Sequence, residues 1–202
     1  MDRPRRNLVG WAVAAACLVP LALLAWDAWR GGLGANPIQA VELRTGKPAL
    51  VLLVFSLAVS PTARITGWSR LRPMRRVLGL CAFFYACLHA LTFIGLDYGF
   101  DPRLLPEALF QKRFALAGVA AFLALLPLAI TSTRSWQRRL GRDWGRLHRL
   151  AYLAGLLATV HYIWQTKADI TQPALWAGAL VLLLLARLPS YLKARQQARP
   201  GG

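Results

Sequence analysis

The stretch VLGLCAFFYACLHALTFIGL, residues 77–96, contains no charged side chain and only two plainly polar ones, His89 and Thr92. A helix of about 20 apolar residues is long enough to cross the hydrocarbon core of a bilayer. Because lipid offers no partners for backbone N–H and C=O groups, such a run is expected to be helical. The stretch therefore predicts a transmembrane helix that carries a histidine inside the membrane.

Similar apolar runs recur along the chain and are separated by basic connections. This pattern explains how a chain of 202 residues can be 56% hydrophobic and still carry a net charge of +17. A soluble protein would need six buried helices with almost no polar face, which is not how surface helices are patterned. We therefore predict an all-α, polytopic membrane helix bundle, formed as a single domain over residues 1–202 with no evident internal repeat. The six predicted transmembrane helices are residues 8–26, 48–63, 77–96, 114–133, 150–166 and 170–186.

The basic residues predict the orientation of this bundle. Most of the 25 Lys and Arg residues lie in four stretches, residues 3–6, 64–76, 134–149 and 187–199, and most of the eight acidic residues lie in the other connections. Cytoplasmic loops are enriched in Lys and Arg, so both termini are predicted to be cytoplasmic. A nucleic-acid surface is a poor explanation of the charge, because these arginines are divided among four separate stretches.

Two of the three histidines are predicted to lie at the same depth. His89 lies roughly 18 Å along its predicted helix from the cytoplasmic end, and His161 lies roughly 16–17 Å along its own. Histidines inside membrane spans are rare and are candidates for a function. Two imidazoles at one depth on parallel helices suit the axial ligation of haem iron. A proton relay remains an alternative, although the predicted spans contain no carboxylate partners.

The third histidine, His148, is expected at the cytoplasmic entry of the fifth predicted helix. It is about 20 Å from His161 along the helix axis, too far for the two to share one zinc ion. His148 is a candidate for a second haem, for contact with a haem propionate or a flavin phosphate, or for an interfacial histidine without a cofactor.

Several motifs resemble the MsrQ family, formerly called YedZ, over about residues 36 to 188. The most specific are RRVLGLCAFFYACLH at 75–89, LAITS at 128–132, LGRDWGRLHRLAY at 140–152 and HYIW at 161–164. The resemblance implies a ferric reductase-like transmembrane domain that binds haem b, as one or two groups, in the bacterial inner membrane. It also implies that His89, His148 and His161 are the haem ligands.

The resemblance further implies an electron-transfer subunit that performs no substrate chemistry of its own. Electrons would come from quinol or a cytosolic flavin reductase and pass to a periplasmic MsrP-type molybdoenzyme that reduces methionine sulfoxide. Binding of FMN has also been attributed to the family. No nucleotide-binding domain is visible in the chain itself, and nucleic acid is not an expected partner.

The chain departs from the wider ferric-reductase pattern at one position. That pattern places a second histidine thirteen residues before His89, where this chain has Arg76. Arg75, Arg76 and Arg146 are therefore candidate partners for propionates or an FMN phosphate, since guanidinium groups pair bidentately with such anions. Anchoring of the cytoplasmic loops is the competing role for these arginines. A proton-coupled transporter or channel with a histidine relay, or an assembly factor, are the alternative functions.

Overall fold

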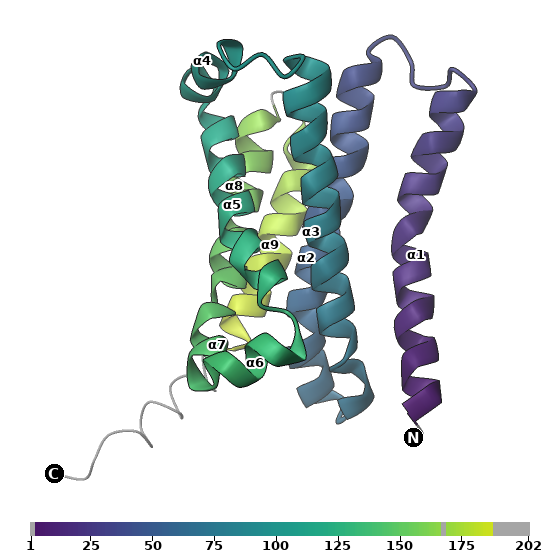
Figure 1. The fold of residues 1–202 in the computed structure, drawn as a ribbon, viewed down its shortest axis with the longest axis vertical. Coiled ribbons are helices and arrows are strands. Elements are labelled where there is room, and N and C mark those ends of the chain that lie inside the picture. The colour runs from purple at the N-terminus through teal and green to yellow at the C-terminus, as the bar shows by residue number, and fades with distance from the viewer. Residues whose placement is uncertain (1–2, 167–168, 188–202) are drawn as a thin grey trace, which may run out of the picture.

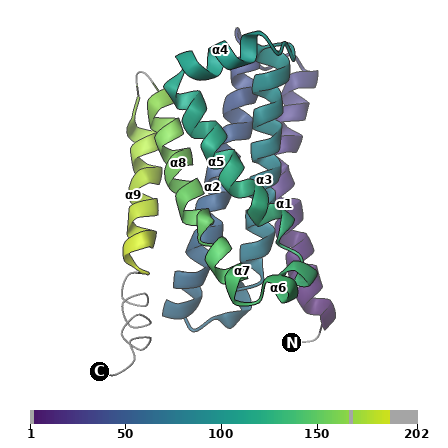
Figure 2. The ribbon, with the colours of Figure 1, turned by 60° about the vertical axis from the view of Figure 1, so that its left-hand side comes forward.

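A computed structural model describes residues 3–166 and 169–187 as a bundle of helices aligned along one axis (Figures 1 and 2). All of the regular structure in these residues is helical, which confirms the all-α part of the predicted fold class. The long helices are α1 (Arg3–Trp29), α2 (Pro37–Ile65), α3 (Met74–Leu91), α5 (Arg113–Ile130), α8 (Leu150–Gln165) and α9 (Thr171–Leu185).

Short helices cover the two ends of the bundle. At one end α4 (Leu104–Gln111) lies across the top of the long helices in Figure 2. At the opposite end lie α6 (Arg134–Leu140) and α7 (Arg142–Leu147), together with the start of α1. The short 3₁₀ turn η1 (Ser69–Leu71) connects α2 to α3. We refer to these as the α4 end and the α6–α7 end.

The second helix begins well before the predicted residue 48. Pro37 occupies its first turn, and the side chain of Asn36 accepts a hydrogen bond from the backbone N–H of Gln39 at 3.1 Å. Proline at the first position and asparagine at the cap are both strong signals for the start of a helix. The charged residues Glu42, Arg44 and Lys47 interrupt the apolar pattern in this first part of α2, so hydropathy alone predicts a loop there.

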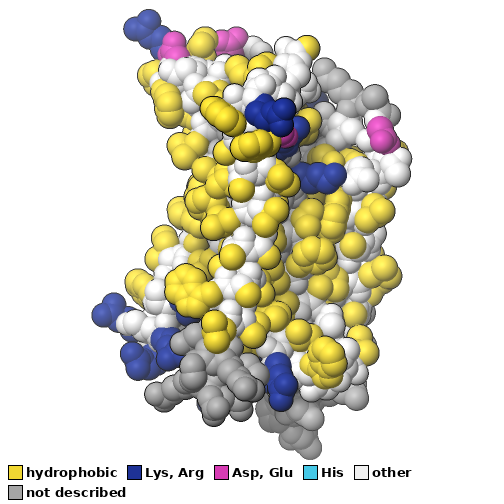
Figure 3. Space-filling view, turned by 90° about the vertical axis from the view of Figure 1, so that its right-hand side faces the viewer, with side chains coloured by type: hydrophobic (Ala, Val, Ile, Leu, Met, Phe, Trp, Pro, Cys, Tyr) yellow, Lys and Arg dark blue, Asp and Glu magenta, His cyan; other side chains and the backbone are white. Residues whose placement is uncertain are grey.

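Four helical segments of the described chain are long and apolar enough to cross a membrane: Leu8–Trp29, Pro37–Ile65, Ser69–Asp97 and Arg113–Ile130. The helices α8 and α9 have 16 and 15 residues, so they are shorter than those four. Figure 3, which views the side of the molecule that carries α1, shows hydrophobic side chains over the middle and charged side chains toward the ends. This distribution is typical of a membrane protein.

The core of the bundle is built by two helical hairpins. The chain runs from the α4 end to the α6–α7 end in α2 and returns in α3, and it repeats this path in α5 and α8 (Figure 1). Ala82 of α3 and Ala154 of α8 are fully buried and pack in one cluster with Leu57 of α2 and Leu180 of α9. Such small residues let transmembrane helices approach each other closely.

Two side chains from neighbouring helices bond to backbone groups close to a proline inside a helix. Pro61 has no N–H to donate to the carbonyl of Leu57, and the guanidinium of Arg187 donates to that oxygen at 2.6 Å. In α1, beside Pro20, the Tyr85 hydroxyl accepts from the Leu21 N–H at 3.1 Å and donates to the Cys17 carbonyl at 2.8 Å. Buried backbone groups need partners, so these bonds attach α1 and the end of α9 to the α2–α3 hairpin.

Candidate functional site

The imidazole rings of His89 and His161 face each other inside the half of the bundle near the α4 end. His89 lies near the end of α3 and His161 near the end of α8, and their ring centres are 5.9 Å apart at an interplanar angle of 78°. The predicted equality of depth is therefore what the structure shows. A metal–nitrogen bond is about 2 Å long, so two imidazoles on opposite sides of one iron would have ring centres about 6 Å apart.

Each of these rings is held by a backbone carbonyl of a neighbouring helix. The Nδ1 atom of His89 lies 3.0 Å from the Glu42 carbonyl oxygen, and the Nδ1 atom of His161 lies 2.6 Å from that of Phe114. A carbonyl oxygen can only accept, so both Nδ1 atoms carry the proton and both Nε2 atoms keep a free lone pair. This is the arrangement found in metal-binding histidines, where the second nitrogen donates to a carbonyl or carboxylate.

A glycine lies against each ring. A Cβ atom at Gly46 would meet the Cε1 and Nδ1 atoms of His89 at 3.1 Å, and a Cβ at Gly118 would meet Nδ1 and Cε1 of His161 at 2.8 and 2.9 Å. The rings therefore occupy space that any other residue type would fill. The donor set, two neutral imidazoles among apolar helices, fits haem iron.

His148 lies far from this pair, between α7 and α8 at the α6–α7 end. Its Nε2 atom is 3.1 Å from the Thr131 hydroxyl, whose own proton is donated to the Pro127 carbonyl at 2.6 Å. The single proton of Thr131 is thus already used, and His148 must donate from Nε2. Its ring stacks on Trp144 with centres 4.0 Å apart. In this arrangement His148 does not present a free Nε2, unlike His89 and His161.

Burial lowers the pKa of His148, and the nearby positive charge of Arg75 lowers it further, while a hydrogen bond to the backbone of Thr131 acts in the opposite direction. The neutral imidazole is therefore favoured near pH 7. This is the protonation state in which histidine binds metals.

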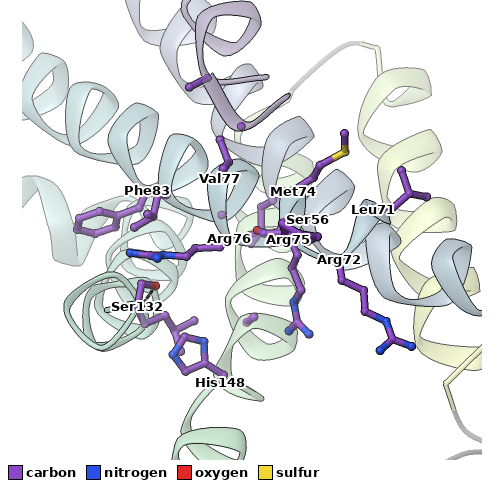
Figure 4. A pocket seen from close by; sticks show the side chains of 18 of the residues that line it. Ser56, Leu71, Arg72, Met74, Arg75, Arg76, Val77, Phe83, Ser132 and His148 are labelled. Carbon is purple, nitrogen blue, oxygen red and sulfur yellow. Dashed lines mark hydrogen bonds between the residues drawn. The ribbon is translucent and has the colours of Figure 1, made fainter. Parts of the chain in front are cut away.

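A large cavity opens beside His148. Its volume is about 1230 Å³, and it is bounded by residues of α1, α2, α3, α5, α6, α7 and α8 and by the segment 67–73. Figure 4 shows the side chains of Arg75 and Arg76 entering the same space as His148. Arg75 also donates to the Ser60 hydroxyl at 3.4 Å. Arginine is the preferred residue for recognition of phosphate and carboxylate groups, so the cavity suits an anionic ligand.

Arg146, the third arginine predicted for this site, lies elsewhere. It forms an ion pair with Asp143 at 2.7 Å, and 75% of its side chain is exposed. It is not among the residues that line the cavity. The structure thus brings Arg75, Arg76 and His148 together and leaves Arg146 on the surface of α7.

Four further residues of these sites escaped sequence reasoning: Gly46, Gly118, Thr131 and Trp144. The two glycines carry no functional group, so only their closeness to the histidines identifies them. Thr131 is the threonine of the LAITS motif, and its carbonyl also accepts from Trp144 Nε1 at 2.9 Å. The motif and the tryptophan of the basic loop were visible, but nothing in the sequence paired them with His148.

Comparison with known proteins first defines the class. Residues 45–159 match the family model described as "Ferric reductase like transmembrane component". This range contains all of α3, the helix that carries His89. It also contains most of the part of α8 that precedes His161, and it ends two residues before that histidine. The chain is thus a ferric reductase-like transmembrane protein.

Individual relatives define the family more closely. The chain is 47% identical over 191 residues to "Protein-methionine-sulfoxide reductase heme-binding subunit MsrQ" of Xanthomonas axonopodis pv. citri, covering 91% of this chain and 87% of the relative. The protein of the same name from Rhodospirillum rubrum is 43% identical over 199 residues, covering 98% of this chain and 95% of the relative. The chain therefore belongs to the MsrQ family, and the resemblance found in its motifs is confirmed.

Proposed function

We propose that this chain is the haem b-binding membrane subunit of a methionine sulfoxide reductase system and conducts electrons through the bundle. The observation that carries the proposal is the facing pair His89 and His161, with both Nδ1 atoms bonded to backbone carbonyls and both Nε2 atoms free. The names of the MsrQ relatives, which describe heme-binding subunits, support it.

In this proposal His89 and His161 would hold one haem between them near the α4 end. When bound, the haem supplies a reversible one-electron centre. The protein holds both rings in one tautomer and one orientation through the Glu42 and Phe114 carbonyls. The surrounding helices exclude water, and low solvent exposure together with ligand hydrogen bonding tunes the reduction potential.

We place electron entry at the cavity near the α6–α7 end. Arg75 and Arg76 would bind the propionates of a second haem or the phosphate of FMN, and His148 is available as a ligand on one side. The remaining candidate, Arg146, would have to leave Asp143 to take part. His148 would have to release the Thr131 hydroxyl before its Nε2 could bind iron.

The orientation and the partners complete the proposal. All six long helices would cross a bacterial inner membrane with both termini in the cytoplasm, which places the arginine-rich α6–α7 end on the cytoplasmic side. Quinol or a cytosolic flavin reductase would deliver electrons there. A periplasmic MsrP-type molybdoenzyme would receive them at the α4 end and reduce methionine sulfoxide. A reporter that works only in the periplasm should be active when fused after Asp101 and silent after Arg139.

A histidine proton relay is less well supported by the geometry. A relay needs imidazoles that exchange protons at both nitrogens, whereas both Nδ1 atoms here donate to backbone carbonyls that cannot pass a proton on. No group of three or more His, Cys, Asp and Glu side chains gathers in the described part of the chain either.

The experiment that tests the function uses the chain purified from haem-replete membranes. The protein should show a Soret band and low-spin b-type absorption on reduction. The reduced form should be reoxidised when the periplasmic partner and methionine sulfoxide are added together, and not by either alone. A well-folded but colourless preparation, or a red one that the complete partner system cannot reoxidise, would contradict the proposal.

A further inference from the structure

The two hairpins, α2–α3 and α5–α8, repeat one structural unit with an offset of 72 residues. In each hairpin a histidine donates from Nδ1 to a carbonyl 47 positions earlier in the chain. The matching positions are 89 and 161 for the histidines, 42 and 114 for the carbonyls, 46 and 118 for the glycines, and 82 and 154 for the fully buried alanines. Parallel repeats of this kind are related by an axis along the membrane normal.

The spacing inside the unit has a physical reason. Residues four apart lie one above the other on the same face of a helix. Gly46 is four residues after Glu42, and Gly118 is four residues after Phe114. A side chain at either glycine would therefore stand beside the carbonyl that holds the imidazole. Its absence lets a ring from the next helix reach that carbonyl.

We propose that Gly46 and Gly118 are positioning residues that set the planes of His89 and His161. This inference rests on the proposed role of the two histidines as haem ligands. Each ring is placed by two features, the carbonyl that accepts from its Nδ1 and the space that the neighbouring glycine leaves open. Together the two units hold the rings nearly perpendicular, at 78°.

The angle between the ligand planes has a spectroscopic consequence. The relative orientation of two axial imidazoles controls the anisotropy of the low-spin ferric EPR signal, and near-perpendicular planes give a strongly anisotropic signal with a large low-field g value. This signal reports the ring planes and is insensitive to the general stability of the bundle. It can therefore distinguish a positioning role from ordinary helix packing.

The test compares Gly46→Ala and Gly118→Ala with two matched glycine variants. A Cβ at Gly155 of α8 would be crowded by Leu180 at 3.3 Å and Leu57 at 3.4 Å but touches no histidine, and a Cβ at Gly178 of α9 meets nothing within 4 Å. Alanine favours helix over glycine, so loss of helix propensity cannot explain a defect. Haem content per chain and the EPR signal are measured on each purified protein.

In Gly118→Ala the new methyl group overlaps the ring of His161, so we expect a shifted low-field g value and weaker haem binding. The loss should be of order 10–100-fold in affinity, as for other groups that orient metal ligands. In Gly46→Ala the new Cβ would lie 3.1 Å from the nearest ring atom of His89, compared with 2.8 Å between a Cβ at Gly118 and His161. Gly46→Ala should therefore shift the same signal less. Gly155→Ala and Gly178→Ala should keep the wild-type signal.

Wild-type g values in both Gly46→Ala and Gly118→Ala would overturn the inference while leaving the haem proposal standing. An equal shift in Gly155→Ala would also overturn it, because crowding alone would then be the cause. If Gly118→Ala does not fold, the milder Gly46→Ala decides. Absence of haem from the wild-type protein itself would instead contradict the proposed function.

Discussion

The Nε2 atom of His148 donates to the hydroxyl of Thr131, whereas no hydrogen bond within the described part of the chain engages the Nε2 atom of His89 or His161. The three histidines of this chain are therefore not equivalent. Two present the nitrogen that would bind iron under the proposed function, and the third bonds through it to Thr131 at the edge of the large cavity. This difference separates the site near the α4 end from the site near the α6–α7 end.

Thr131→Val should remove the hydroxyl partner of His148 Nε2 without altering the Thr131 backbone carbonyl, which accepts from Trp144. Valine has nearly the shape of threonine but cannot accept a hydrogen bond. We expect the cofactor signal of the cavity, whether haem or flavin, to change while the His89–His161 signal stays the same. Absorption and EPR spectra of the purified variant check this.

Thr159→Val is the matched control, because the Thr159 hydroxyl is also buried but bonds only to the Gly155 carbonyl of its own helix. It should leave both signals as in the wild type. A Thr131→Val protein that is spectroscopically identical to Thr159→Val would show that the His148 contact has no influence on the cavity.

Arg76, which lines the cavity, should contribute more to the binding of an anionic cofactor than Arg146, which lies on the surface. Arg76→Gln removes a cation from the cavity, and a lost hydrogen bond to a charged partner costs about 1.5–3 kcal/mol. We therefore expect the affinity for the anionic cofactor of the cavity to fall roughly tenfold to a hundredfold. Titration of purified protein with FMN or haem measures the change.

Arg146→Gln serves as the control for total charge, since Arg146 pairs with Asp143 outside the cavity. Surface ion pairs contribute about 0–1 kcal/mol, so its effect should be small. Equal losses in the two variants would indicate that net positive charge, and not the cavity, controls binding.

The contact of Arg187 with Leu57 should be coupled to Pro61. Arg187→Met leaves the Leu57 carbonyl without a donor, and we expect the free energy of unfolding to fall by about 1.5–3 kcal/mol. In a Pro61→Ala background the backbone regains an N–H that can donate to this carbonyl, so the same substitution should cost less. Thermal unfolding of the four proteins in detergent gives the coupling energy as a double-mutant cycle.

A coupling energy indistinguishable from zero would mean that Arg187 stabilises α9 by other contacts. One such contact is its position over the ring of Tyr152, at 4.9 Å from the ring centre.

The composition and the apolar runs were enough to predict an all-helical bundle, and helical rise alone placed His89 and His161 at one depth. Helix α2 extends beyond the predicted span 48–63, because hydropathy follows the apolar run while Asn36 and Pro37 start the helix before it. The role of the arginines was harder to predict, because positive charge at a membrane face looks the same whether it lines a cavity, as at Arg76, or pairs on a surface, as at Arg146.

The internal repeat was not visible in the sequence because its two copies share so few residue types. Positions 76 and 148, which are also 72 residues apart, are arginine in the first hairpin and histidine in the second. Among the matched positions named above, only the histidine, the glycine and the alanine are the same in both hairpins. What repeats is a backbone carbonyl and an absent side chain. Neither feature changes the hydropathy or the charge pattern of the sequence.

The central claim is that His89 and His161 bind one haem between them. The most direct measurement is the low-spin ferric EPR signal of the purified protein, compared among His89→Ala, His161→Ala and His148→Ala at matched protein concentration. The first two variants should lose one and the same signal, and His148→Ala should retain it. If His89→Ala and His161→Ala removed different signals, or if either kept the full wild-type spectrum, the two histidines would not share an iron.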